Sequence, residues 1–198
     1  MFFDKELVRA NLLRWESTLQ EYALPTWDQF PALPLYMDQV IFLMNEYLTL
    51  LPDDRQEEKQ VTPAMINNYV KLKIIPPPVK KRYSRVHLAY LVMVCVLKLT
   101  MNTAEIKKLL PADLPEETVK DIYAAFGHAT QDIKGGFCQS VRAMAQPVLE
   151  QDGPPVTWLI FRTAVAANLF KQATQQLVSL RQEANKKPTL ESESTSSL

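Results

Sequence analysis

Three consecutive prolines, Pro76 to Pro78, separate two segments with helical sequence patterns, and this interruption constrains the fold of the 198-residue chain more than any other feature. Proline has no amide hydrogen and a fixed φ, so three in a row end a helix and favour an extended backbone. The sequence VKKRY follows closely. We therefore expect the prolines to hold Lys80, Lys81 and Arg82 on a short, stiff arm that projects from the protein.

The rest of the chain has the pattern of an all-α protein. It contains only four glycines, and its apolar residues recur at the three- and four-residue spacing of a buried helix face. The pairs Asn102/Glu105 and Asp113/Glu116 have the spacing of capping boxes, which predicts two helix starts. Helices are expected at about 4–22, 35–51, 62–73, 85–99, 102–110, 116–149 and 155–185, the sixth of them broken near Gly135 and Gly136.

The charge of the chain is zero in total but is unevenly distributed. From Thr62 to Leu110 there are nine lysines and arginines and one acid, Glu105, so this segment carries +8 and the remainder −8. Such asymmetry is typical of a basic surface that meets a polyanion. A solvated basic face without a partner is the alternative.

The predicted helix that opens with Thr62 and Pro63 has two contrasting faces. A hydroxyl that caps free amides, followed by proline at the first helical position, is a typical helix start. The polar face comprises Ala64, Asn67, Asn68 and Lys71, and the apolar face comprises Met65, Ile66, Tyr69 and Val70. Asparagine lowers helix propensity, so two adjacent copies suggest a function. An asparagine amide can pair with the edge of adenine, and a lysine can bind phosphate.

The order of these features resembles the winged helix-turn-helix of the MerR family: a Thr-Pro helix start, a proline arm, a basic strap ending in Tyr-Ser, an apolar helix, and a capped short helix with EIKKLL. The resemblance implies that the helix before the prolines enters the major groove and that the wing grips the phosphate backbone. It assigns recognition positions to Ala64, Asn67, Asn68 and Lys71, and wing positions to Lys80, Lys81, Arg82 and Tyr83. Arg85, from the same basic segment, completes the expected DNA-binding set.

A longer part of the chain, about residues 25–150, resembles a narrower family. The segments LYMDQVIFLMNEYL, TPAMINNYVKLKIIPPPVKKRYSR and LKLTMNTAEIKKLL resemble an uncharacterised, MerR-like domain of unknown function in small bacterial proteins of the Firmicutes. The expected organisation is N-terminal helices packing on the core in 1–60, the winged helix-turn-helix in 61–112, a C-terminal helical region in 113–187 and a disordered tail in 188–198. Residues 53–60, DDRQEEKQ, are expected to form a charged loop.

Catalysis and metal binding are not expected. His87 and His128 have no cysteine or carboxylate at ligand spacing on the same helix face, so no metal or other cofactor is predicted. His87 is expected beside the wing, touching phosphate or solvent. Phosphate-binding glycine loops and nucleophile motifs do not occur, which argues against an enzyme. Cys95 and Cys138 lie in apolar helical patterns and are predicted to be small buried residues.

The last predicted helix carries an apolar seam. If Thr163 is included, its members follow steps of three and four residues: Val156, Leu159, Ala166, Phe170, Ala173, Leu177, Leu180 and Ala184. Three interpretations stay open at this point. The seam packs inside one subunit, it forms a homodimer, or the region provides a small-molecule effector pocket lined by Trp158, Phe161 and Phe126.

Together these features favour a dimeric transcriptional regulator that binds double-stranded DNA. A protein-interaction adaptor that binds an acidic partner on a winged-helix scaffold is the alternative, and RNA binding is a third hypothesis. The chain shows neither an N-terminal signal pattern nor an apolar run long enough to cross a bilayer, so we expect a cytoplasmic location without a membrane partner.

Overall fold

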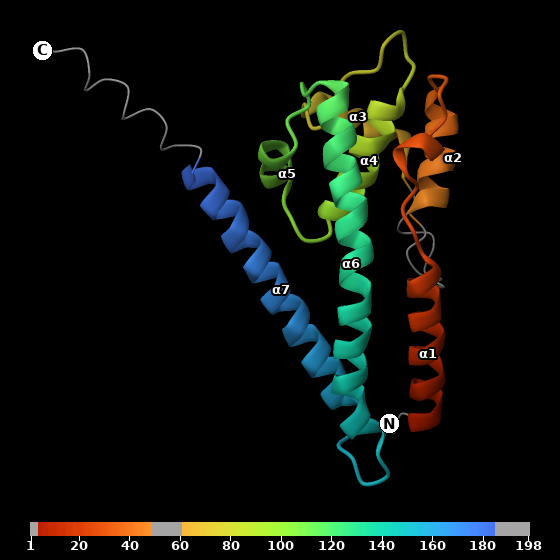
Figure 1. The fold of residues 1–198 in the computed structure, drawn as a ribbon, viewed down its shortest axis with the longest axis vertical. Helices are drawn as coiled ribbons and strands as arrows, with labels where there is room; N and C mark the ends of the chain where they lie inside the picture. Colours follow the sequence, from red (N-terminus) through yellow and green to blue (C-terminus); the bar gives the residue numbers. More distant parts are fainter. Residues whose placement is uncertain (1–3, 49–60, 185–198) are drawn as a thin grey trace, which may run out of the picture.

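The computed structural model describes residues 4–48 and 61–184, and these ranges form an all-helical fold, as predicted. Figure 1 shows a head of short helices at one end and long helices that extend from it to the other. The helices are α1 (Lys5–Glu21), α2 (Met37–Tyr47), α3 (Pro63–Lys71), α4 (Arg85–Leu97), α5 (Thr103–Leu109), α6 (Glu116–Leu149) and α7 (Thr157–Ala184), with a 3-10 turn at Trp27–Gln29. The predicted charged loop at 53–60 and the predicted tail at 188–198 lie outside the described residues.

Local capping accounts for most of the helix starts. The Thr62 hydroxyl accepts a hydrogen bond from the amide of Met65 at 3.3 Å, as the Thr-Pro start predicts. Asn102 and Glu105 form the predicted capping box, with bonds of 2.9 and 2.8 Å. The second predicted box is wrong, because α6 begins after Pro115 without a side-chain cap.

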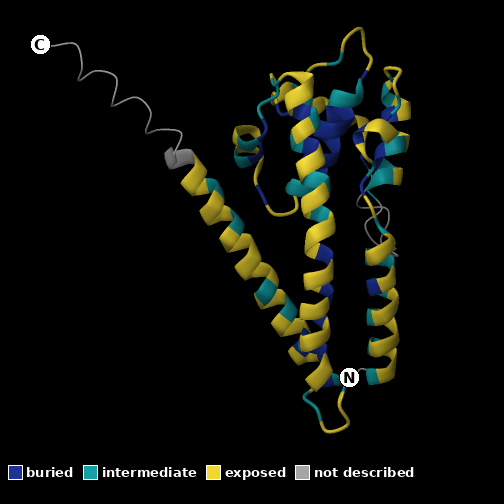
Figure 2. Cartoon of the chain, viewed as in Figure 1, coloured by how far each residue is buried: buried dark blue, intermediate teal, exposed yellow. Residues whose placement is uncertain are grey.

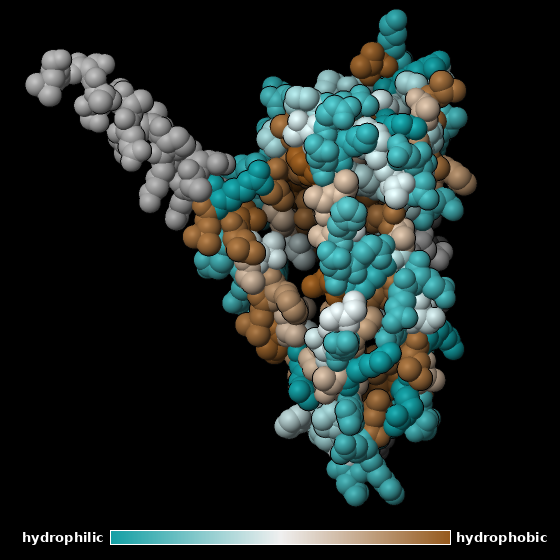
Figure 3. Space-filling view, viewed as in Figure 1, coloured by the Kyte–Doolittle hydropathy of each residue, from teal (hydrophilic) through white to brown (hydrophobic). Residues whose placement is uncertain are grey.

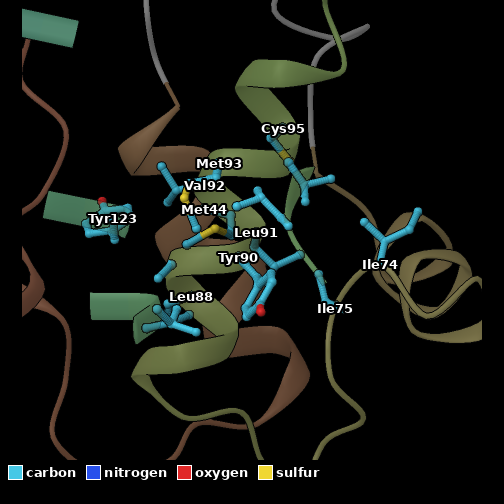
Figure 4. Packing of buried hydrophobic residues seen from close by; sticks show 14 of the residues in the cluster. Met44, Ile74, Ile75, Leu88, Tyr90, Leu91, Val92, Met93, Cys95 and Tyr123 are labelled. Atoms are coloured by element: carbon cyan, nitrogen blue, oxygen red, sulfur yellow. The ribbon is translucent and has the colours of Figure 1, made fainter. Parts of the chain in front are cut away.

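Helix α4 forms the centre of the head. Nine consecutive residues, His87–Cys95, are buried, so α4 needs neighbours on every side. Figure 4 shows residues of three other segments gathered around this helix: Met44 of α2, Tyr123 of α6, and Ile74 and Ile75 of the segment 72–84 between α3 and α4, which we call the arm. The helix expected at 85–99 is therefore central to the core, and the predicted burial of Cys95 and Cys138 is confirmed.

Helix α6 joins the head to the rest of the molecule. It packs against α4 as well as against α1 and α7, which flank it in Figure 1. The Tyr123 hydroxyl donates to the carbonyl of Pro25 at 2.7 Å. Lys134 is only 7% exposed, and its ammonium donates to the carbonyl of Tyr22 and to Gln131. These bonds attach the end of α1 to α6 and satisfy a buried charge, which is costly when unpaired.

A second buried charge fixes the middle of α1 to α6. Glu16 is 8% exposed and accepts two hydrogen bonds from the Arg142 guanidinium, the one from Nε at 2.8 Å. Nearer the start of α1, the Lys5 ammonium donates to the carbonyl of Glu150 at 2.7 Å. No helix in the described ranges is both long and apolar enough to span a lipid bilayer.

Helix α6 runs without interruption through Gly135 and Gly136, so the predicted break is wrong. Its buried residues Lys134, Cys138 and Val141 recur at helical spacing on both sides of the glycine pair. Packing of this stripe outweighs the propensity cost of glycine, which is about 1 kcal/mol per residue in a helix interior.

Replacing Gly135 and Gly136 by alanine should therefore stabilise the protein. A Cβ built at either position meets no atom within 4 Å. We expect the free energy of unfolding in urea to rise by roughly 0.5–1 kcal/mol per substitution. Gly153→Ala is the matched control and should destabilise, because its Cβ would clash with the Pro147 carbonyl oxygen. Lower stability of the Gly135→Ala/Gly136→Ala variant would contradict a continuous α6.

Candidate nucleic-acid interface

Helix α3 presents its amide face to solvent. The residues of its predicted polar face, Ala64, Asn67, Asn68 and Lys71, are all exposed. On the opposite face Ile66 is fully buried, and burial raises the pKa of Tyr69 to about 12, so its hydroxyl stays neutral at physiological pH. The packing thus leaves the polar face free to meet a partner.

The turn that ends α3 depends on a lysine in an unusual conformation. Lys73 has a φ of 55°, in the left-handed region that favours glycine. Its amide donates to the Val70 carbonyl at 3.0 Å, and the amide of Ile74 donates to the Tyr69 carbonyl at 2.9 Å. This is the Schellman pattern of helix ends. The turn directs Ile74 and Ile75 into the core, where they are 1% and 0% exposed.

The arm ends in a two-residue hairpin with lysine at both central positions. Val79 and Arg82 exchange backbone hydrogen bonds of 3.1 and 2.9 Å, and Lys80 and Lys81 have φ values of 49° and 62°. Two successive positive φ values define a type I′ turn, for which Asn-Gly is the preferred sequence. A left-handed conformation costs a residue with a Cβ roughly 1–2 kcal/mol. The hairpin thus carries strain that another sequence would relieve.

These three lysines have the only positive φ values in the described part of the chain. They are exposed, and none of them pairs with an acid within residues 4–48 and 61–184. Figures 1 and 2 show the segment between α3 and α4 projecting with exposed residues at the end of the molecule remote from the α6–α7 turn. This end therefore combines exposed positive charge with the amide face of α3. We refer to Lys71, Lys73, Lys80, Lys81, Arg82 and the polar face of α3 as the basic tip.

Arg82 is positioned by a residue that the sequence did not point to. Its guanidinium lies 4.7 Å from the centre of the Tyr36 ring, and one of its nitrogens donates to the Tyr36 hydroxyl at 2.8 Å. Tyr36 follows Leu35, whose backbone pairs with that of Tyr83 through two bonds of 2.8 Å. A single β-bridge thereby joins the segment before α2 to the residue that follows the hairpin. Neither Tyr36 nor Lys73 had a local sequence signal.

The structure uses two of the expected DNA-binding side chains internally. Tyr83 is 3% exposed and belongs to the core, so its ring cannot reach a phosphate as the resemblance implied. Arg85 is half-buried, and its Nε donates to the carbonyl of Phe30 at 3.0 Å. Tyr83 packs in the core and Arg85 attaches the start of α4 to Phe30, so neither side chain belongs to the basic tip.

His87 braces the arm instead of facing solvent or phosphate. Its ring is 5% exposed, and Nδ1 lies 3.0 Å from the amide of Ser84. Because an amide can only donate, Nδ1 accepts, and Nε2 carries the hydrogen that is donated to the Pro77 carbonyl at 3.2 Å. Burial lowers the pKa of His87, and the Pro77 bond offsets part of this shift. The neutral ring therefore connects the proline arm to the start of α4.

The effector pocket expected from the aromatic residues is not formed by those side chains. Trp158 and Phe161 are 56% and 65% exposed, whereas Phe126 packs against the core of the head. A groove of about 390 Å³ lies elsewhere, between α1 and α6. Its lining includes Leu12, Trp15, Glu16, Cys138, Val141 and Arg142.

Residues 25–126, just over half of the chain, match a family described as a domain of unknown function, DUF1836. The chain belongs to the DUF1836 family. The match begins after α1 and ends within α6, so it includes the whole basic tip of this DUF1836 protein and excludes α7. No curated protein and no solved structure matches the chain.

Relieving the strain of the hairpin should stabilise the DUF1836 domain. The variant Lys80→Asn/Lys81→Gly has the preferred type I′ sequence, and we expect its free energy of unfolding to rise by about 1–2 kcal/mol. The control Lys80→Ala/Lys81→Ala removes the same two charges but keeps a Cβ at each strained position, so its free energy of unfolding should rise much less. Equal stability of the two variants would show that charge repulsion, and not backbone conformation, destabilises the turn.

The brace formed by His87 should weaken in acid. Its pKa is lower in the folded protein than the ordinary value of about 6.5 in the unfolded chain. The unfolded chain therefore binds the proton more readily, so the contribution of His87 is complete above pH 6.5 and is lost as the pH falls toward the lower folded value. Urea unfolding of the parent and of His87→Gln should show a stability difference that shrinks between pH 7.5 and pH 5. A pH-independent difference would contradict this role.

Proposed function

We propose that this DUF1836 protein is a non-enzymatic, DNA-binding transcriptional regulator whose basic tip contacts double-stranded DNA. The observation that carries the proposal is the left-handed backbone of Lys73, Lys80 and Lys81. Glycine or asparagine would adopt these conformations with less strain. The presence of lysine at all three positions, without an acid to pair with in the described ranges, supports a surface that binds an extended polyanion.

The proposal divides the basic tip into two parts. The exposed polar face of α3 enters the major groove, which admits one α-helix. Asn67 or Asn68 then pairs with adenine, while Lys71 binds the phosphate backbone of the DNA and so positions the helix. Lys80 and Lys81 bind phosphates beside the groove, and Arg82 stays where Tyr36 positions it.

The order of the elements supports a MerR-like winged helix-turn-helix as the finer description of this head. Helix α3 precedes an arm that begins with the buried Ile74 and Ile75, the arm leads into a short hairpin, and the hairpin is followed by the core helix α4. In that arrangement the hairpin is the wing. A regulator of this kind needs no catalytic group at the basic tip, where the side chains are amides, lysines and one arginine.

Selection of bound sequences from random duplexes should reveal a preferred site for the parent protein. We expect Asn67→Ala or Asn68→Ala to relax the preference at one position, at a cost of about 1–3 kcal/mol for the preferred base. Both variants should stay folded because neither side chain is buried. Lys71→Ala is the contrasting variant, and it should weaken binding to all sequences alike.

The stabilised hairpin variant provides the control for phosphate binding. Lys80→Asn/Lys81→Gly should fold better and yet bind every duplex more weakly, with the slope of log affinity against log salt reduced by about 0.9 for each phosphate that the variant no longer neutralises. Unchanged salt dependence would mean that the hairpin does not contact DNA. Identical base preferences in the parent and both asparagine variants would mean that the polar face of α3 does not read sequence. A parent that enriches no duplex would favour an acidic protein or RNA as the partner.

A further inference from the structure

Helix α7 exposes more apolar surface than a helix of an isolated monomer normally does. Eight of its large apolar side chains are at least half exposed: Trp158, Ile160, Phe161, Val165, Leu169, Phe170, Leu177 and Leu180. Figure 2 shows α7 exposed along almost its whole length, and Figure 3 shows apolar side chains along it on the visible face. The described part of the chain therefore leaves most of this helix uncovered.

The exposed residues lie on two sides of α7. Trp158, Phe161, Val165 and Leu169 follow steps of three and four residues, so they share one face, directed away from the buried Val156 and Leu159. The stripe that begins with Val156 and Leu159 continues through Thr163 and Ala166 to Phe170 and Leu177. Val156 and Leu159 at its start are 8% and 7% exposed, whereas Phe170 and Leu177 are 65% and 67% exposed. Val178 packs against the core of the head. Beyond its first residues, however, the stripe is largely not covered by α6.

We propose that a second copy of this chain covers α7, with the outward face of Trp158, Phe161, Val165 and Leu169 at the centre of a two-fold interface. This inference goes beyond the proposed function, because it holds whether or not the basic tip binds DNA. It also moves the interface from the predicted seam. Val156 and Leu159 of that seam are buried within the chain, and none of the four central residues belongs to it.

The exposed area is sufficient for a stable dimer. With roughly 200 Å² for each large side chain, the four central side chains, about 60% exposed, offer on the order of 500 Å² of apolar area per copy. A standard stable interface buries about 800 Å² of each partner, and about 60% of that area, roughly 500 Å², is apolar. The outward face of α7 therefore supplies about the apolar area that a dimer interface requires.

Charge complementarity favours a second copy over an unrelated partner. The sequence of α7 contains three basic residues, Arg162, Lys171 and Arg181, and one acid, Glu183. Lys171 and Arg181 form no ion pair within the described ranges. Helix α6 carries exposed acids at Glu116, Glu117, Asp121 and Asp132. One copy therefore presents both the apolar face and the two signs of charge that an identical copy requires.

The test is the mass of the full chain in solution without nucleic acid, measured by sedimentation equilibrium over a range of concentrations. We expect the parent to be a dimer, and Phe161→Glu/Leu169→Glu to weaken the dimer at least 100-fold while keeping its helical circular dichroism. Phe42→Glu is the control, since Phe42 is a comparably exposed apolar residue (66%) on α2 and its substitution should leave the dimer intact.

Two results would overturn the inference. A parent protein that is monomeric at 50 µM would assign the α7 surface to another kind of partner. Unchanged dimer affinity in the milder variant Val165→Gln/Leu169→Gln, chosen in case the glutamate variant fails to fold, would place the interface elsewhere. Neither result depends on DNA, so failure of this inference is distinguishable from failure of the proposed function.

Discussion

Helix α4 is buried along nine consecutive residues, and no single neighbour can cover a helix on all sides. Helices α2 and α6 cover part of it, and the arm covers another part through Ile74 and Ile75. Because these two isoleucines must lie in the core, the chain on either side of them is constrained as well. Helix α3 ends where the arm enters the core, and the hairpin begins where the prolines leave it. The position of the basic tip thus follows from the burial of α4.

The brace behind the basic tip combines several weak interactions from distant segments. His87 connects Pro77 to Ser84, Leu35 pairs with Tyr83, and the ring of Tyr83 packs edge-on against that of His87 at 5.4 Å. Each bond is worth only about 1 kcal/mol by itself. Together they hold a short hairpin whose central lysines would otherwise favour a different backbone. A rigid support of this kind is what a binding surface on a short loop needs.

Two parts of the chain depart from the rules that govern a stable isolated domain. The hairpin has lysine where glycine or asparagine would be less strained, and α7 exposes apolar side chains that an isolated helix would replace by polar ones. Such departures concentrate at functional surfaces, because only there does another requirement compete with stability. The two parts are well separated in Figure 1, so binding at the basic tip and self-association through α7 need not interfere.

The sequence by itself determined the all-α class, the helix starts at Thr62 and Asn102, the central apolar helix and the two faces of α3. All of these depend on residues within a few positions of one another, through capping, proline geometry and helical periodicity. Only the tertiary structure decided that α6 continues through Gly135 and Gly136, that Tyr83 and His87 are buried, and that Tyr36 holds Arg82. It also decided the left-handed conformation of the three lysines, which local preference disfavours. The physical reason is the same in each case: contacts between segments distant along the chain outweigh a local preference of about 1 kcal/mol, and local sequence patterns carry no record of those contacts.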